Sequence, residues 1–479
     1  MIDRFRPALT HEHGQLTHGQ LDAEVTRLAG EFRMQGVRTA ATLLDNGPAW
    51  VIVDMALARA GAVHIPIPVF FTEAQVQHAL AASGTDTLIA PSAMASRWAG
   101  LPHRALAAGV QMLTQLSLPG RKVPMPAGTC KITFTSGTTG NPKGVCLSAQ
   151  GMDQVVQGLV QALAPLDIQK HLCALPLPVL LENIAGVMAP LAHGAQCVVL
   201  PLERVGLSGS SSFNPAVFHQ TVLHHAPDSL ILLPQMLRAW TLWLQATGQR
   251  APASLKMVAV GGAAVGARLI EDAHAVGILA YEGYGLSEGS SVQTLNLPGA
   301  SRPGSAGRAL PHTQLRIDEQ GQIHIAGSLM AGYLGETAPA PSWWATGDIG
   351  HLDADGFLHV HGRLRHVLIT AYGRNVSPEW VETALRGESV VAQAVVFGEG
   401  QPQLSAVIWP LQPSVPDEQI EAAVQAANHS LPDYARIGHW VRAQEPFNTA
   451  SGMATANGRP QRDAIFQRHT DALVPAATT

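Results

Sequence analysis

The sequence predicts an α/β fold in which a large domain is followed by at least one smaller domain. The chain has 479 residues, more than a single ordinary hydrophobic core accommodates. Helical patterns alternate with short apolar runs along its first part, which is typical of a mainly parallel sheet covered by helices. Hydrophobic residues make up 46% of the chain and charged residues only 14%, so we expect a well-buried globular protein.

The first helices are marked by capping boxes. Thr17 with Gln20 begins an amphipathic helix, and Thr72 with Gln75 begins another that we expect to end at Gly84. Further strands are expected over residues 38–44, 62–67, 87–90, 230–233, 257–260 and 357–361, and a buried helix over 50–59. Near the C-terminus the pattern predicts helices over 377–385 and 418–428 and strands over 390–397 and 404–409, which is enough for a compact α+β domain.

The most informative stretch is residues 135–144, TSGTTGNPKG, which directly follows a short strand pattern over 131–134. Its glycines let backbone N–H groups approach an oxyanion, its hydroxyl residues add donors, and Lys143 adds a mobile positive charge. A Walker A loop is disfavoured, because Gly144 follows Lys143 where that motif has Ser or Thr. A polar surface linker is the alternative, but the position directly after a strand favours a phosphate-binding loop.

The totals exclude several classes of protein. The net charge of −5 gives no basic excess, so we expect no nucleic-acid partner. No apolar run reaches the ~20 residues that span a bilayer, so no membrane span is expected. The four cysteines form no C-x-x-C pair, which fits buried thiols in a reduced, cytoplasmic protein. The histidines lack the spacings of a zinc site.

The stretch TSGTTGNPKG resembles the phosphate-loop signature of the adenylate-forming (AMP-binding) superfamily, which includes acyl-CoA synthetases, peptide-synthetase adenylation domains and luciferases. Other segments that resemble this superfamily follow in order along nearly the whole chain: GGAA at 261–264, EGYGLSE at 282–288, GSLMAGY at 327–333, ATGD at 345–348, GRLR at 362–365 and NGRPQR at 457–462. The resemblance implies a large N-terminal domain of helix-covered sheets, residues 1–362, and a small C-terminal domain, residues 363–479, that rotates about a hinge.

The resemblance also implies the reaction. ATP and a carboxylic acid give acyl-AMP and pyrophosphate, and the acyl group then passes to a thiol. The segments ENIAG and RNVSPEW are most similar to fatty-acyl-CoA synthetases, so an apolar acid and CoA are the expected partners. A carrier protein, an amine or a hydroxyl would use the same acyl-AMP, and the residues leave this choice open.

Site residues follow from the resemblance position by position. The implied catalytic residues are Lys143, Glu288, Arg363 and Arg459, and the implied magnesium ligands are Thr135 and Glu288. A single carboxylate suffices there, because Mg²⁺ keeps several waters. Tyr284 is expected to stack on adenine and Asp348 to accept from the ribose. The implied nucleotide-binding residues are Thr135, Ser136, Gly137, Thr138, Thr139, Gly140, Lys143, Gly262, Ala263, Ala264, Glu282, Gly283, Tyr284, Gly285, Ser287, Asp348 and Arg363.

Four positions depart from the superfamily pattern, and one of them, Ser287, replaces the usual threonine while keeping a hydroxyl. Arg459 stands where a lysine is usual, and arginine keeps the charge but is wider and planar. Four alternatives remain open for Arg459. The protein adenylates more slowly, adenylates with altered geometry, or has lost the first step and only binds nucleotide or acyl-AMP. In the fourth alternative, Arg459 is merely a surface residue. Arg365 replaces the usual hinge aspartate or lysine. Val179, in a segment expected to form a turn and a core helix, replaces a histidine or aromatic residue.

A serine hydrolase is the rival from another class. Residues 285–289 match G-x-S-x-G around Ser287, with Asp348 and His359 or His361 downstream in a workable order. That motif needs a helix immediately after the serine, and the residues that follow are mediocre helix formers. The hydrolase hypothesis also leaves the phosphate-type loop without a role.

Overall fold

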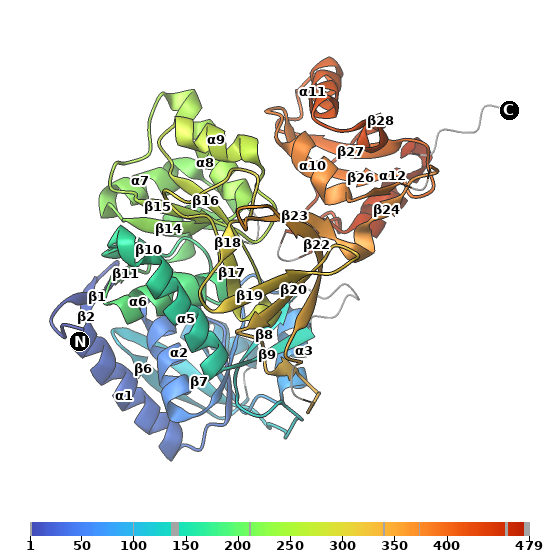
Figure 1. The fold of residues 1–479 in the computed structure, drawn as a ribbon. Helices are drawn as coiled ribbons and strands as arrows, with labels where there is room; N and C mark the ends of the chain where they lie inside the picture. Colours follow the sequence, from blue (N-terminus) through green and yellow to red (C-terminus); the bar gives the residue numbers. More distant parts are fainter. Residues whose placement is uncertain are drawn as a thin grey trace.

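The computed structural model describes residues 2–98, 100–135, 143–209, 212–338, 341–372, 374–455 and 458–473. Two large sheets, each with parallel strands at its centre and antiparallel strands toward its edges, organise the N-terminal part (Figure 1). This arrangement confirms the predicted α/β fold class. The sequence pattern did not reveal the antiparallel edges.

The first large sheet has nine strands, of which β1, β11, β10, β14, β15 and β16 run parallel in that spatial order. In order across the sheet its strands are β18 (Arg308–Ala309), β17 (Ser291–Leu295), β16 (Ala280–Leu286), β15 (Met257–Val260), β14 (Ser229–Leu232), β10 (Lys170–Leu172), β11 (Gln196–Val198), β1 (Pro7–His11) and β2 (Gly14–Thr17).

The second large sheet has eight strands and leads directly to the predicted phosphate loop, because β8 ends at Thr135. In order across the sheet its strands are β21 (Gly332–Tyr333), β9 (Lys143–Ser148), β8 (Thr129–Thr135), β4 (Val63–Pro66), β3 (Thr39–Thr42), β5 (Thr87–Pro91), β7 (Gln111–Ser117) and β6 (His103–Ala108).

Helices pack against these sheets. The hydrophobic core that contains Phe32 and Trp50 also contains Leu9 of the nine-stranded sheet and Ile89 of the eight-stranded sheet, so helices α1 and α2 lie between the two sheets. The helices of this part are α1 (His18–Met34), α2 (Pro48–Ala60), α3 (Glu73–Ser83), α4 (Ser92–Ala95), α5 (Ala149–Leu163), α6 (Ala189–His193), α7 (Pro215–His225), α8 (Pro234–Thr247) and α9 (Ala267–Ala275).

A four-stranded antiparallel sheet follows and ends where the chain passes to the C-terminal part. Its strands are β19 (Thr313–Ile317), β20 (Gln322–Gly327), β22 (Trp344–Leu352) and β23 (Leu358–Arg363). A small ribbon of β12 (Leu207–Ser208) and β13 (Ser212–Phe213) lies elsewhere in the large part.

The residues after Arg363 pack around cores of their own. The two hydrophobic clusters of this region draw only on side chains beyond Arg363 among the described residues. Its elements are β24 (Leu368–Ile369), β25 (Asn375–Val376), α10 (Pro378–Arg386), β26 (Val391–Phe397), β27 (Leu404–Pro410), α11 (Asp417–His429), β28 (Ile437–Arg442) and α12 (Arg462–Leu473). Figure 1 shows this part, orange to red, set to one side of the rest.

The contacts between the two parts include polar ones. Arg238 of α8 donates to the carbonyl oxygens of Arg386 and Glu388, the latter at 2.7 Å, and Arg268 of α9 pairs with the Glu388 carboxylate at 2.6 Å. Gly362 lies at φ +153°, and a Cβ atom added there would lie 2.1 Å from Ser377 Oγ. The chain therefore needs glycine directly before the passage to the C-terminal part.

Most local predictions are confirmed. Both capping boxes form, and Gly84 ends its helix in the left-handed conformation. Two predictions need correction. The segment after Val179 continues into a π-helix, Glu182–Met188, rather than an ordinary helix, and Ser377 makes no capping bond to α10 but donates to the carbonyl oxygen of His361 at 2.7 Å.

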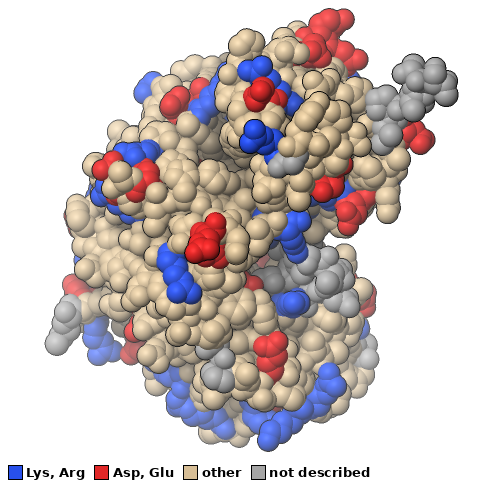
Figure 2. Space-filling view, turned by 45° about the vertical axis from the view of Figure 1, so that its right-hand side comes forward, with Lys and Arg blue, Asp and Glu red and all other residues tan. Residues whose placement is uncertain are grey.

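The surface of the molecule carries scattered charge. Most of the face in Figure 2 is neither acidic nor basic, and its blue and red groups are spread over it apart from a row of blue groups along the lower edge. Within the described ranges, no helix combines the length and the hydropathy that crossing a membrane would take.

A buried polar network anchors β8, the strand that precedes the predicted phosphate loop. Lys131 Nζ lies 2.8 Å from Asp54 Oδ1 of α2, and His64 Nδ1 lies 2.6 Å from the same oxygen. Asn183 of the π-helix donates to Asp54 Oδ2 at 3.2 Å. Burial alone would raise the pKa of Asp54, but Lys131 and His64 outweigh it and hold that pKa well below its ordinary value. The network therefore ties four elements together through one buried charge.

Replacing Lys131 should destabilise the protein strongly. We expect Lys131→Met to lower the free energy of unfolding by about 3–5 kcal/mol, because it leaves the Asp54 carboxylate buried without its main partner. Denaturant unfolding followed by circular dichroism measures this change.

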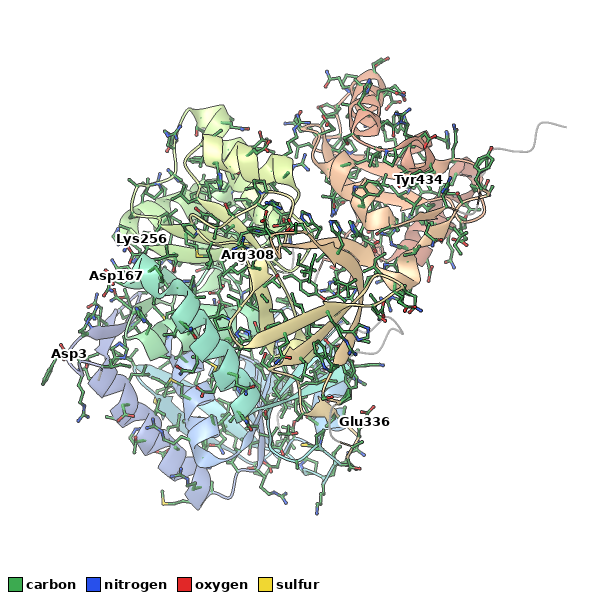
Figure 3. The ribbon with its side chains drawn as sticks, in the orientation of Figure 1. Asp3, Asp167, Lys256, Arg308, Glu336 and Tyr434 are labelled. Carbon is green, nitrogen blue, oxygen red and sulfur yellow. The ribbon has the colours of Figure 1, made fainter. Side chains whose placement is uncertain are left out.

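Lys256 provides the matched control. It pairs with Asp228 at 3.4 Å and donates to the Asp167 carbonyl oxygen at 2.7 Å, and its side chain is 39% exposed. Figure 3 labels Lys256 and Asp167 close together near the surface. We expect Lys256→Met to cost about 1 kcal/mol or less. Equal losses in the two variants would contradict the role given to the Asp54 network.

Candidate functional site

One cavity of about 1720 Å³ lies where β14, β15 and β16 end, and both parts of the chain line it. Crevices at the carboxyl ends of parallel strands are common ligand sites. The cavity brings together every predicted site residue after Thr135 that the structure describes: Lys143, Gly262, Ala263, Ala264, Glu282, Gly283, Tyr284, Gly285, Ser287, Glu288, Asp348, Arg363 and Arg459. The predicted residues Ser136, Gly137, Thr138, Thr139 and Gly140, and the side chain of Thr135, lie outside the described part of the chain.

An ion pair fixes one wall of the cavity. Asp348 and Arg363 face each other in the antiparallel pairing of β22 with β23, and Arg363 Nε lies 2.8 Å from Asp348 Oδ1. The Tyr284 hydroxyl donates to Asp348 Oδ2 at 2.6 Å. Burial raises the pKa of Asp348, while Arg363 and the Tyr284 hydroxyl oppose that rise. The carboxylate therefore joins β16, β22 and β23 at a single point.

A second connection joins Lys143 to Glu288 through Tyr333, which belongs to the GSLMAGY segment and was not among the predicted site residues. The Tyr333 hydroxyl donates to Glu288 Oε1 at 2.9 Å, and Lys143 Nζ lies 5.3 Å from the centre of the Tyr333 ring. Burial and the Glu288 carboxylate raise the pKa of Tyr333, so its hydroxyl stays protonated. Pairing of β21 with β9 positions this ring, which no local sequence signal indicates.

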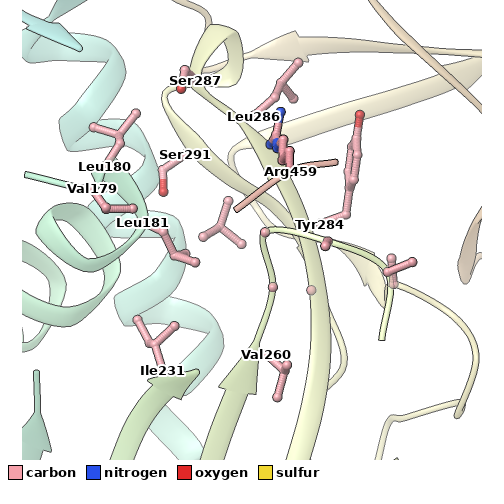
Figure 4. Close-up of a pocket in the computed structure, with 18 of the residues that line it drawn as sticks. Val179, Leu180, Leu181, Ile231, Val260, Tyr284, Leu286, Ser287, Ser291 and Arg459 are labelled. Atoms are coloured by element: carbon pink, nitrogen blue, oxygen red, sulfur yellow. The ribbon is translucent and has the colours of Figure 1, made fainter. Parts of the chain in front are cut away.

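Arg459 lines the cavity and remains exposed to solvent there (Figure 4). The loop that carries it closes on itself: the Thr455 N–H donates to the Arg459 carbonyl oxygen at 2.8 Å, and the Arg459 N–H donates to Thr455 Oγ1 at 3.2 Å. Enclosure by the surrounding protein and the nearby Arg363 lower the pKa of Arg459, whereas Asp348 and Glu288 oppose that change. In the cavity, the Arg363 and Arg459 guanidinium groups therefore lie near the Asp348 and Glu288 carboxylates.

Glu282 has a role that the sequence did not reveal. Its Oε1 accepts a hydrogen bond from the Val265 N–H at 3.1 Å, so the side chain supports the small-residue loop after β15. Burial raises the pKa of Glu282 to about 7, although hydrogen bonds from Val265 and Gly266 act against the rise. The carboxyl group is thus poised to change charge near neutral pH.

The other end of the cavity is apolar. Figure 4 shows Leu180, Leu181 and Ile231 on the opposite side of the cavity from Arg459 and Tyr284. Helix α5, the π-helix and strands β14 and β15 supply most of this apolar lining. The residues concerned are Leu159, Val160, Leu163, Ile168, Val179, Leu180, Leu181, Ala185, Ala189, Leu230, Ile231, Met257 and Ala259. This apolar arm, as we call these residues, is joined to the charged end within one cavity.

The hydrolase hypothesis is wrong in structural terms. After Ser287 the chain makes a single 3₁₀ turn, Ser287–Gly289, and then enters β17, which pairs antiparallel with β16. A nucleophile elbow requires a strand followed at once by a helix. The residues that match G-x-S-x-G therefore lie at the turn of a β-hairpin.

Glu282→Gln should flatten the dependence of stability on pH. The folded pKa of about 7 exceeds the ordinary value of 4.5, so the folded state binds the proton more tightly and the wild type loses stability as pH rises from about 4.5 to 7. The neutral amide of glutamine does not titrate, so the variant avoids this loss of unfolding free energy. Because Glu282 is partly exposed, we expect the loss in the wild type to be about 1–3 kcal/mol.

The difference between the two unfolding free energies, measured by urea denaturation at several pH values, tests this. The difference cancels the titration of the other groups. Parallel curves for wild type and variant between pH 4.5 and 7.5 would show that Glu282 does not titrate there.

Comparison with known proteins agrees with this geometry. A family model described as AMP-binding enzyme matches residues 4–334, and one described as AMP-binding enzyme C-terminal domain matches residues 365–474. A feruloyl-CoA synthase from Amycolatopsis sp. is 29% identical over 435 residues, covering 84% of each chain. A long-chain-fatty-acid–CoA ligase, FadD15, from Mycobacterium bovis is 27% identical over 424 residues, covering 75% of this chain and 70% of its own.

Solved structures share the fold. An anthranilate CoA ligase in complex with anthranoyl-AMP superimposes with a TM-score of 0.80 at 20% identity and covers 97% of this chain and 94% of its own. An O-succinylbenzoate coenzyme A synthetase from Bacillus subtilis, in complex with ATP and a magnesium ion, gives a TM-score of 0.74 at 22% identity and covers 96% of each chain. The chain belongs to the AMP-binding enzyme family, in the adenylate-forming superfamily, and its relatives include proteins named as CoA synthases and CoA ligases.

Proposed function

We propose that the protein activates an apolar carboxylic acid as acyl-AMP at the expense of ATP, releases pyrophosphate, and transfers the acyl group to the thiol of CoA. The observation that carries this proposal is the single cavity that joins a charged end to an apolar arm. The charged end suits a triphosphate and a carboxylate, and the apolar arm suits the body of an acid without further charge.

The charged end of the cavity can offset the charge repulsion that opposes the first step. The acid carboxylate must attack the α-phosphate of ATP, so two anionic groups have to approach each other. Arg459 and Arg363 supply positive charge where this approach occurs, and Lys143 with the preceding loop holds the β- and γ-phosphates. Because its ion pair with Asp348 holds Arg363 in place before the reaction, this group stabilises the developing charge without reorganisation.

The walls of the cavity also suit the adenosine part of ATP. Gly262, Ala263 and Ala264 leave room for a flat purine, and a Cβ added at Gly262 would come within 3.1 Å of Leu233. We assign adenine to this loop and to Gly283, Tyr284, Gly285 and Ser287. Asp348 accepts from the ribose hydroxyls, and Glu282 supports the loop.

The donor set also fits a magnesium ion. Glu288 offers one carboxylate, which Tyr333 links to Lys143, and Mg²⁺ is commonly bound by one or two carboxylates together with phosphates and water. We assign Glu288 and Thr135 to it. When bound, the ion neutralises charge on the departing pyrophosphate. Tyr333 orients the Glu288 carboxylate through its hydrogen bond.

The second step requires movement of the C-terminal part, for which we propose a boundary between residues 362 and 363 and a hinge at Arg365. The separate cores on either side of Arg363 support this division, as do the polar contacts of Arg238 and Arg268. A carrier-protein thiol, an amine or a hydroxyl remains the alternative acceptor. The four free cysteines support a reducing, cytoplasmic location.

Acid-dependent exchange of labelled pyrophosphate into ATP tests the first step. We expect exchange with aliphatic or aromatic monocarboxylic acids and much less with dicarboxylic or sulfonated acids, which would bury a second charge in the apolar arm. Lys143→Ala and Glu288→Ala should each lower the exchange rate by about 10²–10³-fold, because each removes charge stabilisation from the transition state.

Two exposed residues outside the cavity serve as controls. Lys122→Ala and Glu319→Ala make the same chemical changes at exposed positions and should leave the rate unchanged. Absence of exchange with every acid of a broad panel, or equal rates in cavity and control variants, would overturn the proposed function.

Arg459 separates a working ligase from a degenerate binding protein. Because its guanidinium lies near Asp348, Glu288 and Arg363, we expect Arg459→Ala to slow pyrophosphate exchange by about 10²–10³-fold. Transfer of the acyl group from supplied acyl-AMP to CoA should change much less. If Arg459→Lys instead creates exchange activity that the wild type lacks, the natural arginine marks a protein that binds nucleotide or acyl-AMP without making it.

A further inference from the structure

Three histidines line one face of the β22–β23 hairpin. His351 of β22 stands opposite His359 of β23 in the strand register, and His361 follows two residues later on the same face. The ring centroid of His351 lies 4.8 Å from that of His359 and 5.0 Å from that of His361. We call these three residues the histidine stripe. The nucleotide, acid and acceptor assignments above leave it unused.

The spacing of two nitrogens suits a shared metal ion. His351 Nδ1 and His361 Nε2 lie 2.8 Å apart, so in the metal-free protein one of them donates a hydrogen bond to the other. Two nitrogens that bind one zinc ion at about 2.1 Å and a tetrahedral angle lie about 3.4 Å apart. The two nitrogens therefore need to move apart only slightly, and one ring needs to change tautomer. Both nitrogens then direct a lone pair at the same ion.

The surroundings keep these lone pairs available. His359 Nε2 lies 3.3 Å from Asp353 Oδ2, so the carboxylate can orient this ring and leave Nδ1 free for a ligand role. Carboxylates that hold a histidine in this way commonly support metal ligands.

The stripe is also accessible, in contrast to a buried cluster of similar composition. His171, Cys173 and Glu182 bring donor atoms within 4.8 Å of one another, but all three are buried. There His171 is already hydrogen-bonded to Ser229 at 2.8 Å and to Glu182 at 3.2 Å. That cluster is a satisfied polar core, whereas His351 is exposed and His359 is 23% exposed.

We infer that His351 and His361, joined by Nδ1 of His359 when the three side chains open and Asp353 keeps its contact with Nε2, form a binding site for a divalent transition metal such as Zn²⁺ or Ni²⁺. Imidazole nitrogens select such ions over Mg²⁺, which prefers oxygen. Two paired strands hold the ligands, so little order has to be gained on binding. His361 also lines the cavity described above, but these ligands are distinct from Glu288 and Thr135, which are assigned to magnesium, and metal binding at them does not depend on the reaction.

Calorimetric titration of the full chain with Zn²⁺ tests this inference. The protein is first stripped with a chelator and measured without nucleotide, because ATP itself binds zinc. We expect one saturable high-affinity equivalent per chain. The double variant His351→Gln/His361→Gln should weaken it at least about tenfold, and His359→Gln should weaken it less.

His224 and His225 provide the matched control. They are neighbours near the end of α7, and the planes of their rings are 88° apart. Replacing them removes two histidines whose rings are not stacked. The double variant His224→Gln/His225→Gln should keep the high-affinity equivalent. Equal affinity in both double variants, or binding that never saturates, would overturn the site. Metal-free melting temperatures should match the wild type, and His351→Gln alone gives a second measurement if the double variant unfolds.

Discussion

The ion pair between Arg363 and Asp348 is the interaction on which the arrangement of the site depends. It forms across two antiparallel strands whose register is fixed by the rest of the four-stranded sheet. Asp348 in turn holds the Tyr284 hydroxyl, and its charge attracts Arg459 from the C-terminal part. Directly beyond Arg363 the chain leaves the large part, so the same residue closes the cavity wall and begins the passage to the second core. Without this pair, the buried carboxylate would face no fixed cation.

Much of this organisation was readable from the sequence, because the signals are local. Capping boxes and helix-ending glycines depend on residues within one turn, and both predicted capping boxes form where expected. The alternation of helices and strands likewise predicted a parallel centre for the sheets. The candidate residues Glu288, Asp348, Arg363 and Arg459 were implied by the resemblance of short, distant segments to the adenylate-forming superfamily, and the fold gathers them in one cavity.

What the sequence could not supply comes from contacts between distant segments. Tyr333 reaches Glu288 because a short edge strand pairs with β9, and no spacing within its own segment encodes that pairing. The supporting role of Glu282 depends on a loop seventeen positions away, and it became visible only through the bond to Val265. The π-helix after Val179 looks like an ordinary helix in sequence, since both place apolar residues at similar intervals. Each of these features depends on tertiary structure rather than on the local sequence.

The presence of arginine at position 459 has a consequence for the range of conditions in which the cavity keeps its charge. A lysine placed beside Arg363 would lose its proton more readily in alkaline media, since an ammonium group starts from a much lower pKa than a guanidinium. Arginine tolerates a neighbouring cation and partial enclosure while staying ionised. The two guanidinium groups can thus remain neighbours without either becoming neutral.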